Sequence, residues 1–236
     1  MSKKHKLGVV GNPIEHSLSP FIHSRFARSE NINIEYLPYK VNDIDFDQFI
    51  KEFFNDPLSK GLNVTLPYKK KAVEIDGDIS NEARFINAVN TIAKDNKNVY
   101  LHSTDGIGFI TDIKKDKSFN FVDTNILFIG AGASAESILY KVAQEKPRHI
   151  SIMNRTEEKA DRLIRKFSNI SSIDNAKESS CNFDLIINCS SAGLTGDFEP
   201  VQEICVTKNA FFYDLNYSLV ETPFCKWASE KSDKVL

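Results

Sequence analysis

The segment ILFIGAGASAES, residues 126–137, constrains the fold more than any other part of this 236-residue chain. An apolar run typical of a buried strand ends at Gly130, and a helical pattern begins directly after it. Gly130, Gly132 and Ala135 form G-x-G-x-x-A, a variant of the dinucleotide-binding fingerprint, in which the glycines allow a tight turn and a close approach to pyrophosphate. The alternative is a glycine-rich turn that only packs well. We predict a Rossmann domain whose helix N-terminus holds the phosphates through residues Gly130, Ala131, Gly132, Ala133 and Ser134.

The end of the next predicted strand indicates which dinucleotide would bind. Sites for NAD place an Asp or Glu about 20 residues further on, where it holds the ribose 2′-hydroxyl. The sequence SIMNRTEEK offers Asn154, Arg155 and Thr156 instead. A guanidinium attracts a 2′-phosphate and can stack on adenine, whereas a carboxylate would repel the phosphate. We therefore predict NADP; the alternative is that Arg155 only ends a strand and Thr156 caps the next helix.

Short apolar runs alternate with helical patterns along the chain, which is typical of parallel βαβ units. A helix is expected after residue 18, with Ser19 as its N-cap and Pro20 at its first position. A polar stretch at 112–125 is expected to be a linker with a short helical end. We predict two α/β domains, residues 1–105 with an open and mainly parallel sheet and residues 106–236 with a Rossmann fold. Strands of the first domain are predicted at 6–10, 34–41, 60–65, 86–95 and 98–104.

The composition argues against several classes of protein. Thirty Lys and Arg residues against 32 Asp and Glu residues give a net charge of -2, so no basic field favours nucleic acid. The four cysteines form no C-x-x-C pair, which argues against a zinc site or disulfide scaffold and fits a reducing compartment. No run has the length of a signal or membrane-spanning segment. We expect a cytoplasmic protein, monomer or homodimer, that binds small molecules but no metal, nucleic acid or membrane.

Four loops of the first domain contain more small polar residues than turns alone require. Each follows or contains a predicted strand end, and ligands of open α/β sheets bind at the carboxyl ends of strands. Their hydroxyls, amides, lysine and aspartate together suit a small polyhydroxylated anion. Taken singly, each has a structural explanation, such as Ser17 and Ser19 as turn and cap residues. The loops are GNPIEHSLSP (11–20), GLNVTLPYK (61–69), NAVNTI (87–92) and HSTDGIG (102–108).

These loops, together with GAGAS, NRT, INCSSAG and YDLNYSLVETPF, resemble the shikimate dehydrogenases in order and spacing. The resemblance extends from about Gly8 to Trp227. It implies NADPH-dependent reduction of 3-dehydroshikimate to shikimate, a step of chorismate and aromatic amino-acid biosynthesis. Residues 1–105 would bind shikimate and carry the catalytic groups, and residues 106–236 would bind NADP.

The resemblance also distinguishes between the three consecutive lysines. The family's Asn-x-Thr-x-Pro-x-Lys motif ends in a catalytic lysine, which corresponds to Lys69 here. Asp105 would be the second catalytic residue and would reach Lys69. As an ammonium, Lys69 would donate a proton to the carbonyl oxygen during reduction and accept it back during oxidation. Lys70 and Lys71 are expected to belong to a solvated face.

Further site residues carry over from the resemblance by position. The substrate carboxylate would be bound by Ser17 and Ser19, with Tyr217 beside it. Ring hydroxyls would be held by Thr65, Asn90 and Asp105. Leu215 would lie near the nicotinamide, and the 2′-phosphate would contact Asn154, Arg155 and Thr156.

Two departures from the family pattern bear on activity. Ser103 stands where the family usually has Asn before Thr-Asp-Gly. The family pattern also continues with a glycine-containing segment, a substrate-binding glutamine and a helix that packs back on the first domain, whereas this sequence ends at Leu236. We therefore expect the second domain to lack that helix. Two alternatives stay open: a quinate/shikimate dehydrogenase that uses NAD, which Arg155 disfavours, and a non-catalytic shikimate- or nucleotide-binding relative, which Lys69 and Asp105 disfavour.

Overall fold

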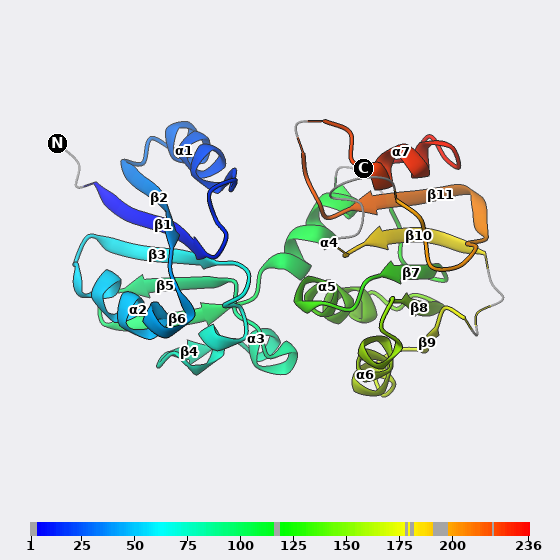
Figure 1. Cartoon of the computed structure of the whole chain (residues 1–236), viewed down its shortest axis with the longest axis horizontal. Helices are drawn as coiled ribbons and strands as arrows, with labels where there is room; N and C mark the ends of the chain where they lie inside the picture. The colour runs from blue at the N-terminus through cyan, green and yellow to red at the C-terminus, as the bar shows by residue number, and fades with distance from the viewer. Residues whose placement is uncertain (1–3, 116–118, 178, 180–181, 191–197, 219) are drawn as a thin grey trace. The chain divides into compact units, whose positions relative to one another are not determined.

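A computed structural model describes residues 4–236 except 116–118, 178, 180–181, 191–197 and 219. The chain divides into two compact units, Met1–Thr104 and Asp105–Leu236, and each has its own sheet (Figure 1). The predicted α/β class with two mainly parallel sheets is confirmed. Part of the INCSSAG motif, residues 191–193, and Cys181 lie outside the described residues.

The sheet of the first unit has the strand order β2-β1-β3-β5-β6-β4. β1 pairs in parallel with β2 and β3, and β4 pairs in parallel with β6, whereas β5 is antiparallel to both β3 and β6. Helix α1 contacts β2 and β1, and α2 contacts β3 (Figure 1). The elements are β1 His5–Gly11, α1 Ser19–Ser29, β2 Ile34–Lys40, η1 Asp43–Asp45, α2 Phe46–Asn55, β3 Ser59–Val64, η2 Lys71–Glu74, β4 Asp78–Ile79, α3 Asn81–Ile86, β5 Thr91–Asp95 and β6 Asn98–His102.

The second unit has an all-parallel sheet with the strand order β11-β10-β7-β8-β9. β7 is central, with β8 on one side of it and β10 on the other, so the order reverses at the fingerprint strand. This reversal is where open α/β sheets bind ligands. The elements are α4 Asp105–Lys115, β7 Asn125–Ile129, α5 Ala133–Gln144, β8 His149–Met153, α6 Glu157–Phe167, β9 Ile173–Asn175, β10 Phe183–Asn188, β11 Val206–Asp214 and α7 Pro223–Ser229.

Two predicted elements of the chain differ from the structure in their bounds. The strand predicted at 86–95 begins only at Thr91, and the helix α3 precedes it. Ser80 caps α3 by accepting a hydrogen bond from the Ala83 N–H at 3.2 Å, and Asn87 ends the helix with a left-handed φ of 56°. Both are ordinary helix boundary signals. The polar stretch at 112–125 begins inside α4, because buried Phe109, Ile110 and Ile113 give that helix an apolar face.

The predicted N-cap role of Ser19 is also wrong. Ser19 is the first helical residue of α1, and the N-cap residue is Leu18, which forms no side-chain capping bond with any described residue. The Ser17 Oγ accepts the Ser19 N–H at 3.3 Å, so the serine two residues earlier orders the helix start. Pro20 does lie in the first turn, as predicted.

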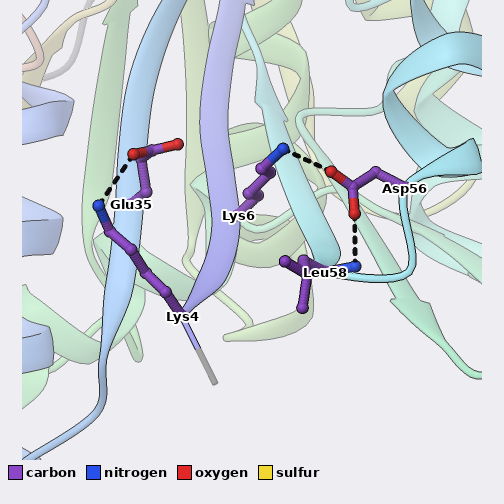
Figure 2. Close-up of polar contacts among 5 residues, drawn as sticks. All are labelled: Lys4, Lys6, Glu35, Asp56 and Leu58. Atoms are coloured by element: carbon purple, nitrogen blue, oxygen red, sulfur yellow. Dashed lines mark hydrogen bonds and ion pairs between the residues drawn. The ribbon is translucent and has the colours of Figure 1, made fainter. Parts of the chain in front are cut away.

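Ion pairs fasten the amino end of β1, at the opposite end of the strand from the predicted ligand loops. Lys4 pairs with Glu35 at 2.9 Å, and Lys6 pairs with Asp56, which also accepts the Leu58 N–H (Figure 2). The hydrogen bond from Lys6 is the main cause that lowers the pKa of Asp56. These exposed pairs connect β1 with β2 and with the turn before β3, and such pairs contribute little to stability individually.

Candidate active site

The fingerprint turn at the end of β7 requires glycine at Gly130. Its φ is 108°, in the left-handed region, and an added Cβ would lie 2.9 Å from the Ser190 nitrogen and 3.0 Å from the Cys189 carbonyl carbon. Its N–H donates to the Met153 oxygen at the end of β8, at 2.7 Å. The turn is therefore held between the ends of β8 and β10.

Gly132 differs from Gly130, because nothing in the described structure itself requires glycine there. It is the N-cap residue of α5 with φ -88°, which any residue can adopt, and no described atom lies within 4 Å of an added Cβ. The described part of the chain provides no side-chain cap for this helix either. The first N–H groups of a helix lack intrahelical partners and favour an anion. An open, uncapped helix start beside a glycine therefore fits a pyrophosphate, while Ala135 behind it is fully buried against the sheet.

The three residues after β8 form a short exposed turn. The Asn154 Nδ2 donates to the Thr156 oxygen at 2.7 Å, and the Arg155 side chain is exposed. Thr156 occupies the N-cap position of α6 as expected, but its side chain forms no capping bond with a described residue. This turn carries no carboxylate that would repel a 2′-phosphate, and Arg155 offers the guanidinium that would bind one.

The loops after β1 and β3 lie side by side in the first unit. The Thr65 N–H donates to the Val10 oxygen, and the Asn12 N–H donates to the Leu66 oxygen, both at 3.0 Å. A Cβ on Gly11 would lie 2.5 Å from the Thr65 Cγ2, so glycine there permits the close approach of Thr65. Two of the four polar loops thus meet as predicted from the parallel pairing of their strands.

Lys69 follows a tightly packed residue. Tyr68 is only 1% exposed, stacks on Phe46 with the ring centroids 4.6 Å apart, and donates its hydroxyl to the Val41 oxygen. The Lys69 main-chain oxygen accepts the Val89 N–H at 2.7 Å, which joins this turn to the third polar loop. The backbone of Lys69 is therefore fixed on both sides, whereas its side chain is only partly buried.

The two following lysines differ from each other, so the prediction of a shared solvated face is wrong for Lys71. Lys70 is exposed. The Lys71 side chain is 26% exposed, and its ammonium pairs with the Asp43 and Asp47 carboxylates and lies over the Phe46 ring. Lys71 therefore ties η2 to the start of α2, and its role in the described structure is to connect these elements.

Asn90 connects the third and fourth polar loops. It is 8% exposed, and its Oδ1 accepts hydrogen bonds from the Thr91 hydroxyl at 2.9 Å, the Thr104 N–H at 3.0 Å and the Thr104 hydroxyl at 3.1 Å. These bonds tie the Asn90 side chain to Thr91 and Thr104. Thr104 ends the first unit, and Asp105 directly follows it as the first residue of α4.

The first polar loop carries a strongly perturbed carboxyl group. Glu15 forms an ion pair with Lys40 at the end of β2 and accepts the Ile14 N–H at 3.0 Å. The hydrogen bond from Lys40 is the largest of the causes that lower the pKa of Glu15 to about 2. The pair ties the loop to the edge strand β2, and Ser17 and Ser19 of the same loop are half-buried.

Leu215 and Tyr217 follow β11 in the second unit. The Leu215 N–H donates to the Asn188 oxygen at 3.0 Å, and the Tyr217 side chain is 65% exposed. The last residue of β11 is Asp214, a buried carboxylate that the sequence did not lead us to predict. The signal that could have found it is a charged residue at the end of the apolar strand sequence AFFYD.

Fold and site together define a two-unit α/β protein with a Rossmann domain whose fingerprint turn is open to a dinucleotide. The shikimate dehydrogenase substrate-binding domain matches residues 9–92, and the shikimate/quinate 5-dehydrogenase domain matches residues 112–214. The chain belongs to the shikimate dehydrogenase family, which confirms the resemblance predicted from its motifs.

Similar proteins include enzymes named NADP-dependent shikimate dehydrogenase. The relative from Colwellia psychrerythraea is 37% identical, over 94% of this chain and 81% of its own length. The relative from Saccharophagus degradans is 35% identical, over 93% and 82%. Among solved structures, the shikimate dehydrogenase of Aquifex aeolicus has a TM-score of 0.85 at 30% identity and covers all of this chain and 86% of its own. A shikimate dehydrogenase in complex with NADP+ has a TM-score of 0.88 at 26% identity, with 100% and 85% coverage.

Proposed function

We propose that this chain catalyses the reversible NADPH-dependent reduction of 3-dehydroshikimate to shikimate, in the biosynthesis of chorismate and the aromatic amino acids. The observation that carries the proposal is the fingerprint turn, with its strained Gly130 and open Gly132, in a chain of the shikimate dehydrogenase family. The substrate and the NADP dependence are those printed in the names of its relatives.

The residues of the second unit fit NADP. The main-chain N–H groups from Gly130 to Ser134 would hold the pyrophosphate at the start of α5. Asn154, Arg155 and Thr156 would hold the 2′-phosphate, and the bond from Asn154 to the Thr156 oxygen keeps that turn compact. NADPH, when bound, supplies the hydride.

Lys69 is the residue to which we assign proton transfer. Its backbone is anchored by buried Tyr68 and by the bond from Val89, so its position in the chain is defined. As an ammonium it would donate a proton to the carbonyl oxygen of the substrate during reduction, and the resulting amine would accept it during oxidation. Asp105, at the start of α4, would be its carboxylate partner in the reaction.

The substrate would be held by hydroxyl, amide and carboxylate groups of the polar loops, together with Tyr217 after β11. Ser17, Ser19 and Tyr217 would bind its carboxylate. Thr65, Asn90 and Asp105 would bind its hydroxyls, and the bonds from Thr91 and Thr104 to the Asn90 Oδ1 would hold that side chain in place.

The remaining assignments are consistent with the sequence. A net charge of -2 supports a small-molecule partner rather than nucleic acid. The proposed oligomeric state is a monomer or a homodimer. Three described cysteines, Cys189, Cys205 and Cys225, are free thiols, which supports a reducing compartment such as the cytoplasm. None of the helices in the described ranges is long and apolar enough to cross a membrane.

The test is the decrease of NADPH absorbance when 3-dehydroshikimate is added to the purified chain. We expect turnover with NADPH and far less with NADH. Turnover of quinate with NAD would favour the alternative dehydrogenase. Tight NADPH binding without turnover of either substrate would favour a non-catalytic relative.

A further inference from the structure

Asp214 is a buried carboxylate at the last position of β11. It is 9% exposed, and four donors converge on it. Its Oδ1 accepts bonds from the Asn188 Nδ2 at 2.9 Å and from both the N–H and the Nδ2 of Asn216 at 3.0 Å. Its Oδ2 accepts the Thr222 hydroxyl at 2.6 Å. A buried carboxylate is tolerated when it is hydrogen-bonded in this way.

These bonds extend from Asp214 to the fingerprint turn. Asn188, fully buried at the end of β10, uses its Oδ1 to accept both the N–H and the hydroxyl of Ser190, at 3.2 and 2.7 Å. The Asn216 Nδ2 also donates to the Ser190 oxygen at 2.8 Å. The Ser190 nitrogen is the atom closest to the position of a Cβ on Gly130. Asp214 thus orients Asn188 and Asn216, which together fix the residue that packs against Gly130.

The same carboxylate fixes the chain that leaves β11. Leu215 is held to the Asn188 oxygen, and Asn216 is bonded directly to Asp214. The Thr222 Oγ1, besides donating to Asp214, accepts the Cys225 N–H and so caps α7. The end of β10, the segment after β11 and the start of α7 are therefore all bonded to the Asp214 side chain.

The strand order indicates which half of a dinucleotide these loops would meet. In the order β11-β10-β7-β8-β9, the fingerprint follows β7, and the proposed 2′-phosphate turn follows β8 on one side of it. A dinucleotide whose pyrophosphate lies at β7 and whose adenosine lies over β8 extends its other half towards β10 and β11. Asn188 and Asp214 lie at the carboxyl ends of those two strands.

We infer that Asp214 is a positioning residue for the nicotinamide half of the cofactor: through Asn188 and Asn216 it sets the residues that directly follow β10 and β11, Ser190 and Leu215–Asn216, over which that half lies. This rests on the proposed function for the identity of the cofactor. Asp214 does not itself touch the dinucleotide. Its replacement therefore alters the placement of the nicotinamide, while the adenosine site at Asn154–Thr156 stays intact.

The test variant is Asp214→Asn, which keeps the shape of the side chain. The amide offers one acceptor oxygen in place of two, so the Thr222 hydroxyl or the donors on Oδ1 lose their acceptor. The matched control is Asp184→Asn. Asp184 accepts the Asn125 N–H at 2.9 Å at the opposite, amino end of β10 and has no part in the proposed site.

The first measurement is the binding of adenosine 2′,5′-bisphosphate, which carries only the adenosine half of NADP. We expect both variants to bind it with wild-type affinity and with one site per chain, which also reports the correctly folded fraction. The second measurement is the fluorescence of bound NADPH, which comes from the reduced nicotinamide. We expect it to change in Asp214→Asn and to stay at the wild-type value in Asp184→Asn.

The third measurement is turnover. Because a displacement of about 1 Å can reduce a rate by ~10²-fold, we expect kcat of Asp214→Asn to fall by about that factor per folded chain, with a larger isotope effect from deuterated NADPH. Unchanged NADPH fluorescence in Asp214→Asn, or equal losses of NADPH and bisphosphate binding, would overturn the inference. If the wild-type chain binds NADPH without reducing 3-dehydroshikimate, the proposed reaction fails, while the two binding measurements still decide the role of Asp214.

Discussion

We expect substitution by alanine to have different effects at Gly130 and at Gly132. In Gly130→Ala the new methyl group would meet the Ser190 nitrogen at 2.9 Å, on a residue whose φ is 108°. In Gly132→Ala the methyl group would point into space that no described atom occupies within 4 Å, on a residue with φ -88°. The first change should therefore reduce stability, and the second should reduce cofactor binding.

The magnitudes follow from these environments. A non-glycine residue in a sparsely populated backbone region costs about 1–3 kcal/mol, before the close contact with Ser190 is added. Gly132→Ala replaces an acceptable N-cap residue with a poor one, at about 1 kcal/mol or less. Its methyl group would displace the pyrophosphate from the helix N–H groups, and each charge-assisted bond lost costs about 1.5–3 kcal/mol, or roughly ten- to a hundredfold in affinity.

The assay compares thermal unfolding with NADP affinity by titration calorimetry. At about 2–4 °C per kcal/mol for a chain of this size, Gly130→Ala should lower the Tm clearly and Gly132→Ala only slightly. Gly108→Ala is the control for added bulk, because a Cβ at that helical position of α4 also meets no described atom within 4 Å. Its NADP affinity should stay at the wild-type value, and its Tm should stay the same or rise slightly, because alanine favours a helix over glycine by about 0.4–1 kcal/mol. An NADP affinity of Gly132→Ala equal to that of the wild type would refute the assignment of this turn as the pyrophosphate site.

Three further outcomes are expected. Lys69→Ala should lose about 10²–10⁴-fold in kcat with a smaller change in shikimate affinity, whereas Lys70→Ala should match the wild type in steady-state kinetics; equal effects would contradict the proton-transfer role. Arg155→Ala should weaken NADP about ten- to a hundredfold in direct titrations but leave NAD unchanged, and equal losses would mean that the arginine is structural. The Glu15 carboxyl should titrate in NMR spectra with a pKa of about 2, and the substitution Lys40→Met should raise that pKa. Because the folded pKa lies below the ordinary 4.5, this pair stabilises the fold above about pH 4.5 and ceases to do so as the pH falls towards 2; an unmoved pKa in the variant would exclude Lys40 as the cause.

The sequence predicted the fold class, the fingerprint and the family, because these depend on local patterns. A strand that ends in G-x-G-x-x-A and opens a helix is a local arrangement, and the φ of Gly130 follows from it. The start of α3 was also locally encoded, in the bond between Ser80 and Ala83, but the apolar residues after it were interpreted as a strand.

Features that depend on tertiary contacts were not predictable in the same way. Lys71 was expected in solvent because it follows two other lysines, yet η2 brings it next to Asp43 and Asp47. Asp214 and Asn188 are 26 residues apart in sequence, and only the pairing of β10 with β11 makes them neighbours. A buried charge requires partners, but the sequence does not indicate which strand supplies them.

The geometry around Gly130 shows why the fingerprint is not sufficient by itself. The motif fixes the conformation of residues 130–135, but the direction of the turn depends on groups outside it. The Gly130 N–H is bonded to the Met153 oxygen, and Cys189 and Ser190 leave no room for a Cβ on Gly130. Ser190 is in turn held by Asn188 and Asn216, and both of these are bonded to Asp214. A pyrophosphate site that relies on main-chain N–H groups tolerates little movement of the backbone, because those groups cannot reorient as a side chain can. The polar residues at the ends of β10 and β11 therefore provide the rigidity that the glycines, which lack side chains of their own, cannot supply.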